Sequence, residues 1–451
     1  MRRIVGAYTV NRLGTWFGFV ALSVAVFDHT HSALAVAAML VSAQVLPAFL
    51  VPAVVARVEA SRARALFSGL YVVEAIATTA LIVVIDNFSL PAVLVLVAVD
   101  GTAALAASAL LRTALARAAR EYASSLDRSH DARDLEADQA AAERSANASL
   151  NVAFSGTFVL GPALAGVIVA SAGASAALAI DVASFLICAA MLIDLHPHVD
   201  EGEGATVRAR LKAAWAYVSE TPALRTLLIA QGVGLVFFES AAPIEVPYAK
   251  IALNAGDRGY GALLASWGIG VVIGSLFFAR SPHRSLGAMI SLGTLAVGLA
   301  YIGFATAPTV LVACLAALLG GIGNGVQWAA AISIVQRLTP QRLLGRIMGA
   351  LESIGAICPA LGLALGGALV AVSSPRTAFL VTGLGAVATT GAFVRVSRMG
   401  IDRPPGSVLP DEAPVTLGSQ LTPYGQEPGL VEPLAEPRSG MTPTSGAPEV
   451  P

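Results

Sequence analysis

Charged residues are scarce in this sequence. Of its 451 residues, 13% are Asp, Glu, Lys or Arg, whereas soluble domains carry about 25%. This shortage excludes an ordinary soluble enzyme, and the formal net charge of −1 excludes the strongly basic character of nucleic-acid-binding proteins. Hydrophobic residues make up 56% of the chain, and the mean hydropathy is +0.74. The composition indicates a membrane protein.

Cysteine clusters and nucleotide-binding motifs are also missing. Cys188, Cys314 and Cys358 each fall inside an apolar run, apart from one another and from His, so we expect buried small residues rather than a metal site or a disulfide. The glycine patterns at 268–274 and 320–325 follow no soluble strand and lack the Lys-Ser/Thr pair of a phosphate loop. We therefore expect no cofactor, no ATP-driven step and no enzyme activity.

Twelve continuously apolar segments are each long enough to cross a bilayer as a helix. They cover residues 12–28, 33–56, 65–85, 89–111, 149–170, 174–195, 224–248, 259–279, 286–306, 309–335, 347–372 and 376–395. The first resembles a signal peptide because Arg2 and Arg3 precede it, but eleven further spans make cleavage unnecessary. The sequence predicts an all-α membrane protein with twelve transmembrane helices.

The basic residues are distributed unequally between the two sides of the membrane. With twelve spans, all of the 28 Lys and Arg residues except Lys250, Arg258 and Arg376 fall on one side. Basic loops stay in the cytoplasm during insertion. Both termini are therefore predicted to be cytoplasmic, in a multi-pass protein of a bacterial inner membrane.

The chain divides into two similar halves. Pro162 lies in the fifth span as Pro359 does in the eleventh, and Arg112 follows the fourth as Arg337 follows the tenth. Such six-plus-six repeats build transporters with a site between the halves. The predicted parts are an N-terminal half (1–195) with a helical cytoplasmic insert at about 113–148, a cytoplasmic linker (196–223), a C-terminal half (224–396) and a disordered Pro-rich tail (397–451). The insert is either a spacer or a regulatory or partner-docking segment.

Acidic residues inside spans are candidate functional residues because a charge in the membrane is costly. The candidates for proton coupling are Asp100, Glu239, Glu74, Glu352 and Asp181. A carboxyl group in apolar surroundings holds a proton more readily than an exposed one, as proton exchange requires. The alternative is that each acid caps a neighbouring helix or pairs with an Arg. Glu245, near Pro247 and Lys250, is expected at the membrane interface.

Uncharged polar and aromatic side chains inside spans are candidates for the lining of an amphipathic cavity. They are Trp16, Gln44, Gln231, Asn324 and Gln327, for which helix packing is the alternative use. Lys and Arg are missing at mid-depth, which argues against a polyanionic substrate.

Several segments resemble the major facilitator superfamily, over about residues 5–396. The resemblance is carried by Ser155-Gly156, Gly161-Pro162-Ala163-Leu164-Ala165-Gly166, Asp181-Val182-Ala183-Ser184-Phe185-Leu186, and Gln336-Arg337-Leu338-Thr339-Pro340 leading to Gly345-Arg346-Ile347-Met348-Gly349. Within that superfamily the chain resembles the macrolide-efflux and siderophore-exporter branch of bacterial drug:proton antiporters. The resemblance implies a gating or packing role for Gly156, Gly161, Pro162, Gly166 and Pro359, because this segment is thought to control helix bending in exporters.

The loop after the second span departs from the family pattern. Pro52 and Ala56 stand where Gly and Asp are usual, and only the basic residues Arg57, Arg62 and Arg64 remain.

The expected protein is a monomeric secondary transporter in the lipid bilayer that exchanges protons for a small amphipathic molecule, such as a drug, siderophore or secondary metabolite. An importer or uniporter of the same fold and a non-transporting scaffold or sensor are the alternatives.

Overall fold

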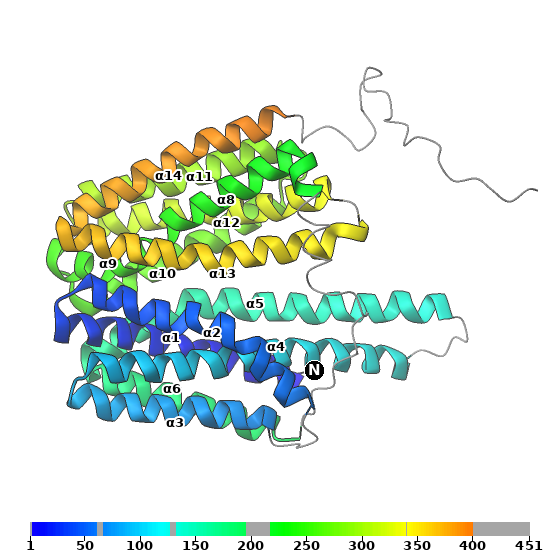
Figure 1. The fold of residues 1–451 in the computed structure, drawn as a ribbon, viewed down its shortest axis with the longest axis horizontal. Helices are drawn as coiled ribbons and strands as arrows, with labels where there is room; N and C mark the ends of the chain where they lie inside the picture. Colours follow the sequence, from blue (N-terminus) through cyan, green and yellow to red (C-terminus); the bar gives the residue numbers. More distant parts are fainter. Residues whose placement is uncertain (1, 61–65, 127–131, 195–216, 340, 400–451) are drawn as a thin grey trace, which may run out of the picture. The chain divides into compact units, whose positions relative to one another are not determined.

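The computed structural model describes residues 2–60, 66–126, 132–194, 217–339 and 341–399, and these residues are almost entirely helical (Figure 1). The helices of the N-terminal half are α1 (Arg2–Thr30), α2 (Ala33–Ala60), α3 (Leu66–Asp86), α4 (Leu90–Leu126), α5 (Ala132–Ala172) and α6 (Ala174–Leu192). Those of the C-terminal half are α8 (Pro222–Glu239), α9 (Ala242–Pro247), the π-helix η1 (Tyr248–Ala252), α10 (Gly256–Ala279), α11 (Leu286–Thr306), α12 (Val310–Leu338), α13 (Gln341–Val372) and α14 (Pro375–Arg398).

The helices form a multi-pass membrane protein. Within the described residues, eleven helical segments are long and apolar enough to cross a membrane, with α8, α9 and η1 counted as one segment. The twelfth is α13, whose residues 357–372 form its apolar part. The predicted twelve-helix fold is confirmed. Most of the predicted linker, together with the tail from residue 400 onward, lies outside the described residues, whereas 217–220 are helical.

Local signals explain where the helices begin and end. Ser285, Thr309 and Ser374 precede α11, α12 and α14, and each side-chain oxygen accepts a hydrogen bond from a backbone N–H in the first turn. Gly173, with φ of 86°, separates α5 from α6, a conformation that favours glycine. In the predicted insert, α4 continues to Leu126 and α5 already begins at Ala132, so the insert extends these two helices beyond their apolar segments.

The seventh span is interrupted, whereas the sequence pattern predicts one continuous segment from 224 to 248. Helix α8 ends at Glu239, four residues before Pro243. Proline has no N–H to donate to the carbonyl four residues earlier, and its ring crowds that carbonyl. Ser240 N still donates to Val236 O, four residues back, but Ala241 N donates to Phe238 O, only three residues back, at 3.2 Å, and the chain restarts as α9. An acidic side chain, Glu239, thus stands at a break inside the membrane segment.

The two ends of the helix bundle are named here after α1: the Arg2 end, where α1 begins, and the Thr30 end, where it finishes (right and left in Figure 1). Inside the N-terminal half, α1 packs on α5 and α6, and α3 packs on α4 and α6. Inside the C-terminal half, α12 packs on α10 and α11, and α14 packs on α8 and α11. The two most extensive contacts between the halves are those of α5 with α10 and of α2 with α13, and α9 makes smaller contacts with α1 and α2.

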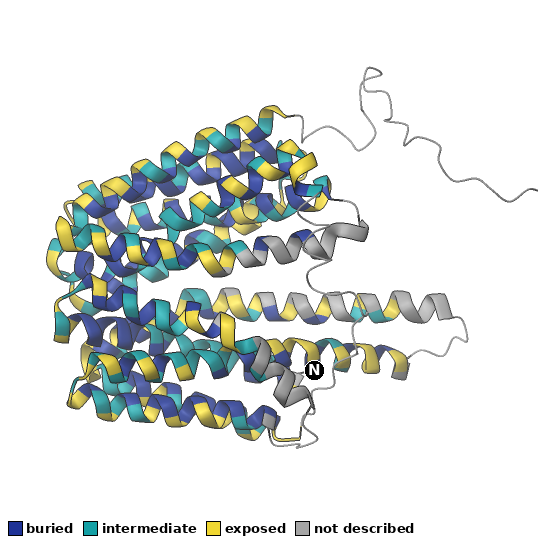
Figure 2. Cartoon of the chain, viewed as in Figure 1, coloured by how far each residue is buried: buried dark blue, intermediate teal, exposed yellow. Residues whose placement is uncertain are grey.

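Among the residues that the structure describes, the hydrophobic core is continuous across the halves at one end and separate at the other. Figure 2 shows buried residues along the helices of both halves. Near the Thr30 end, a single cluster of buried side chains includes Phe17 and Leu40 of the N-terminal half together with Tyr260 and Phe304 of the C-terminal half. Toward the Arg2 end the buried side chains form two separate clusters, each confined to one half. The halves are therefore packed together at the Thr30 end and have separate cores toward the Arg2 end.

Candidate functional site

The contact between α5 and α10 is built on glycine. A Cβ atom at position 166 would lie 2.7 Å from Cα of Gly261, and one at position 261 would lie 2.8 Å from the carbonyl oxygen of Pro162. Real Cβ atoms essentially never approach other atoms so closely, so two glycines are required for these backbones to touch. The exporter-like segment of the sequence thus forms a contact between the halves.

This contact stops part of the way along α5. The carbonyl oxygen of Phe158 packs against Gly268 of α10. One helical turn closer to the Arg2 end, Phe154 is 36% exposed, and no other helix of the described residues comes within 4 Å of the position that a Cβ at Gly156 would take. Residues 166, 162 and 158 of α5 therefore lie against α10, whereas Phe154 on the next turn is accessible.

Trp16 connects α1 to this part of α5. A Cβ atom at position 161 would lie 2.5 Å from Cδ1 of Trp16, so the indole ring lies directly against Gly161. The ring also meets Phe158 edge to face, with 5.0 Å between the ring centroids. Trp16, predicted as a cavity residue, and Gly161, predicted as a gating residue, are therefore in direct contact.

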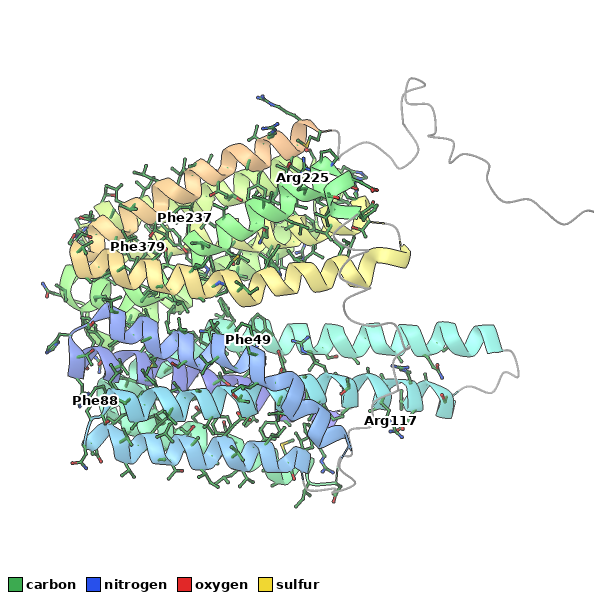
Figure 3. The ribbon with its side chains drawn as sticks, in the orientation of Figure 1. Phe49, Phe88, Arg117, Arg225, Phe237 and Phe379 are labelled. Atoms are coloured by element: carbon green, nitrogen blue, oxygen red, sulfur yellow. The ribbon has the colours of Figure 1, made fainter. Side chains whose placement is uncertain are left out.

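The contact between α2 and α13 is also close near the Thr30 end and more open toward the Arg2 end. Gly367 of α13 lies against Ala33 and Ala37 of α2, close to the Thr30 end. Gln44, two turns further along the same face of α2, is exposed, and Phe49 is 71% exposed (Figure 3). Gln44 is thus accessible beyond the close contact of α2 with α13, and its role in lining a cavity stays a prediction.

Three acidic residues of the N-terminal half lie close to one another. Asp181 on α6 is 4% exposed, and Ser184 Oγ lies 3.4 Å from its Oδ1. Its carboxylate occupies the space that Cβ atoms at Gly14 and Gly18 of α1 would fill. These two glycines therefore make room for a charged group inside the bundle.

The other two members of this group are Glu74 on α3 and Asp100 on α4. Thr78 Oγ1 donates a hydrogen bond to Asp100 Oδ1 at 3.3 Å. Glu74 is 0% exposed, and both of its carboxyl oxygens are without a hydrogen-bond partner in the part of the chain that the structure describes. Electrostatic interactions join Glu74, Asp100 and Asp181, and Asn11 lies beside Glu74. We call Glu74, Asp100 and Asp181 the N-half carboxyl cluster.

The acids of the C-terminal half flank the break between α8 and α9. Glu239 and Glu245 are half-buried and interact electrostatically with each other and with Tyr301. The hydroxyl group of Tyr301 donates a hydrogen bond to the carbonyl oxygen of Phe238 at 3.3 Å, next to the break. Glu245, expected at the membrane interface, is therefore half-buried beside Glu239 near the Thr30 end.

Two predicted cavity residues of the C-terminal half are bonded to each other. Gln327 Nε2 on α12 donates to Gln231 Oε1 on α8 at 2.8 Å, and Gln231 is 2% exposed. This pair ties two helices of the same half together. Asn324, one turn before Gln327 on α12, is half-buried.

The remaining predicted residues are less informative. Pro162 and Pro359 are both buried inside continuous helices, α5 and α13. Arg62 and Arg64 lie outside the described residues. Arg57 lies on α2 and Glu352 on α13, at positions whose side chains are not described.

Sequence reasoning missed an ion-paired group at the Thr30 end. Lys250 Nζ lies 2.6 Å from Asp28 Oδ1 and 2.8 Å from Asp257 Oδ1. Asp28 lies near the end of α1, whereas Lys250 and Asp257 belong to η1 and α10, so the group bridges the halves. The available signal was that Lys250 is one of only three basic residues predicted on this side of the membrane.

Comparison with known proteins identifies the fold. The family model described as Major Facilitator Superfamily matches residues 227–426. No curated protein matches the sequence significantly.

Among solved structures, the chain is similar to the nucleoside transporter NupG, with a TM-score of 0.67, 13% identity, and coverage of 87% of this chain and 98% of that one. It is also similar to a bacterial homologue of the iron transporter ferroportin in an inward-facing state, with a TM-score of 0.65, 15% identity, and coverage of 88% and 98%. A POT family transporter in complex with a thioalcohol-conjugated peptide gives a TM-score of 0.65, 11% identity, and coverage of 89% and 96%. The chain has the major facilitator fold.

Proposed function

We propose that this chain, which has the major facilitator fold, is a secondary transporter that exports a small amphipathic molecule in exchange for protons. The observation that carries this function is the division of the core: the halves share one hydrophobic cluster at the Thr30 end and have separate clusters toward the Arg2 end. A transporter that opens its site first to one side of the membrane and then to the other needs one end at which the halves are packed together and one end at which they are apart.

The distribution of basic residues supports an orientation with the Arg2 end in the cytoplasm. In that orientation the halves have separate cores on the cytoplasmic side, and a substrate can enter between them from inside the cell. Export then requires the contacts of Gly166 with Gly261 and of Gly367 with Ala33 to separate while contacts form at the cytoplasmic ends of the same helices.

The N-half carboxyl cluster is the favoured site of proton coupling. Three carboxylates held close together repel one another, and no Lys or Arg pairs with them among the described residues. Protonation relieves this repulsion and removes the cost of burying charge. A change in water access when the halves rock then loads or releases protons on Glu74, Asp100 and Asp181. Glu239 is a second candidate, at the break in the seventh span.

Purified protein in proteoliposomes tests this function. A proton gradient, acidic on the side of the Thr30 end, is expected to drive at least one member of a panel of anionic, neutral and cationic amphipathic dyes toward that side, and collapse of the gradient is expected to stop net movement of the dye. Asp100→Asn together with Asp181→Asn is expected to abolish gradient-driven movement, whereas Asp86→Asn, at the exposed end of α3, serves as the matched control.

The alternatives give different results in the same assay. An importer moves the dye in the opposite direction, and a uniporter equilibrates it with or without the proton gradient. A scaffold or sensor moves no member of a broad panel of amphipathic dyes under any gradient, and that outcome would exclude transport.

A further inference from the structure

Arg12 is an unusual basic residue in this protein. It lies nine residues beyond Arg3 on α1, about 14 Å deeper along the helix at about 1.5 Å per residue. Arg3 is paired with Asp194 at 3.5 Å at the end of the bundle. Arg12 is half-buried and has no carboxylate partner among the residues that the structure describes. A cation at this depth without a counter-charge is a candidate for contact with a ligand.

The surroundings of the Arg12 guanidinium group are aromatic. Its Cζ atom lies 5.3 Å from the ring centroid of Phe154 on α5 and 5.8 Å from that of Tyr8 on α1. Nε also lies 3.5 Å from the Tyr8 hydroxyl oxygen. These contacts hold the guanidinium group in position by its face. They leave most of its N–H donors free of any carboxylate, and such donors match a carboxylate or another oxyanion in geometry.

An aromatic surface continues from Arg12 toward the centre of the protein. Phe154 lies 5.7 Å from Phe158, and Phe158 lies 5.0 Å from Trp16, between ring centroids. Trp16 is one helical turn beyond Arg12 on α1, and its ring also meets Phe19 at 5.8 Å. One face of α1 and α5 thus carries a cation followed by a row of rings.

This row lies where the two halves part. Phe158 is the last residue of the α5 stripe that touches α10, and Phe154 follows it toward the Arg2 end with 36% of its surface exposed. Arg12 and Trp16 are half-buried rather than enclosed. A molecule that enters between the halves from the Arg2 end meets Arg12 first and the aromatic rings next.

We propose that Arg12, Phe154, Phe158 and Trp16 form a binding site for an amphipathic organic anion that has one acidic head group and a flat apolar body. The acidic group binds the guanidinium group of Arg12, and the body stacks on the rings. This assignment rests on the transport function proposed above and names its class of substrate. The single cation selects a monoanion, whereas a polyanion would need further basic groups.

Three naphthyl compounds of similar size separate charge from apolar contact: 1-naphthoate, the neutral 1-naphthamide and the cationic 1-naphthylmethylammonium. Equilibrium dialysis against the full-length protein in lipid nanodiscs, with empty nanodiscs subtracted, gives the three affinities. The wild-type protein is expected to bind 1-naphthoate at least tenfold more tightly than 1-naphthamide, and the cation most weakly.

Variants locate the source of that preference. Arg12→Gln is expected to bring the ratio of the two affinities close to one while leaving the affinity for 1-naphthamide within about twofold, which also reports intact folding. Arg12→Lys is expected to retain part of the preference for 1-naphthoate over 1-naphthamide, because lysine keeps the positive charge but lacks the planar guanidinium group that can donate two parallel hydrogen bonds. Trp16→Leu is expected to weaken binding of both compounds. Arg3→Gln, which removes an arginine at the end of the same helix, is expected to change neither.

Three results would overturn the anion site: tightest binding of the cation, an undiminished preference for 1-naphthoate in Arg12→Gln, or no saturable binding of any of the three compounds. The last two are the results expected if Arg12 serves only to anchor α1 near the membrane surface. Failure of the transport function looks different. In that case 1-naphthoate binds with the expected dependence on Arg12, but a proton gradient moves neither it nor any dye of the panel in proteoliposomes.

Discussion

Lys250 Nζ is 2.6 Å from Asp28 Oδ1, and this ion pair joins the end of α1 in one half to η1 in the other. Asp257 Oδ1, 2.8 Å from the same nitrogen, completes the group on α10. The side chains of Lys250 and Asp257 are 18% and 20% exposed and that of Asp28 is 48% exposed, so the group is only partly shielded from water. Because it spans the halves at their closed end, it has to break when that end opens.

Removing the charge of Lys250 is therefore expected to favour the state that is open at the Thr30 end. Lys250→Met removes an interaction of at most about 1 kcal/mol, given the partial exposure of the group, which corresponds to roughly a fivefold shift in population. The measurement is the rate at which an impermeant maleimide labels a cysteine placed at Ala37, in protein whose three native cysteines are replaced. Arg258→Gln, which removes an exposed charge at the same end, is the control and is expected to leave the rate unchanged.

The glycines of α5 are expected to differ in their tolerance of substitution. Gly166→Val places side-chain atoms against the Gly261 backbone, so the closed Thr30 end cannot form and transport is expected to fall by at least tenfold. Gly156→Val meets open space and is expected to retain transport. Equal loss in both variants, measured as gradient-driven dye movement, would contradict a specific contact between the halves at Gly166.

The prolines of α5 and α13 offer a second comparison. Gly161 lies against Trp16, whereas its counterpart in the repeat is Cys358. Gly161→Val is expected to displace Trp16 and to impair export more than Cys358→Gly does, and Pro162→Ala more than Pro359→Ala. Export rates at matched protein levels in the membrane measure this difference. If the two copies respond equally, both are plain packing elements.

Glu74 is expected to lower the stability of the folded protein while serving proton-coupled transport. Its carboxyl group is fully buried and makes no hydrogen bond within the described residues. Glu74→Met removes the cost of burying this group and is expected to raise the thermal unfolding midpoint in detergent by a few degrees, while proton-coupled transport is lost. A lowered midpoint would indicate that Glu74 has a structural partner, and unchanged transport would remove it from proton coupling.

The pair Gln231 and Gln327 is expected to be structural. Gln231→Leu alone leaves the half-buried amide of Gln327 without its partner and is expected to destabilise the protein by about 1 kcal/mol. The double variant Gln231→Leu with Gln327→Leu removes both polar groups and is expected to recover most of this loss. Thermal unfolding measures the stability, and transport by the double variant shows whether the amides also contact substrate.

The positions of the spans follow closely from the sequence. Eleven of the predicted segments match a single helix, because about 20 apolar residues in a row can satisfy their backbone groups in a bilayer only as a helix. The seventh span was predicted correctly in extent but not in continuity. Its signal was present in Pro243 and Pro247, yet prolines are tolerated inside α5 and α13, so proline alone does not decide whether a helix breaks.

The site was less accessible to sequence reasoning. The sequence marked Asp100, Asp181 and Glu74 as costly charges, but it did not show that three different helices bring them together with Asn11. It also identified Gln231 and Gln327 as equivalent cavity candidates, whereas the fold bonds them to each other. Side chains far apart in the sequence meet only through helix packing, and the rotation of each helix about its axis is not encoded in an all-round apolar pattern.

By itself, the sequence determined the membrane class, the twelve spans, the two halves and the residues whose charge is expensive, because each of these depends on local hydrophobicity and on the distribution of Lys and Arg. Only the tertiary structure decided at which end of the bundle the halves pack together, that Lys250 joins Asp28 and Asp257 across the halves, and that Arg12 lies at one end of a row of aromatic rings. These features arise from the approach of separate helices, which small residues such as Gly166 and Gly261 permit and which no single segment specifies.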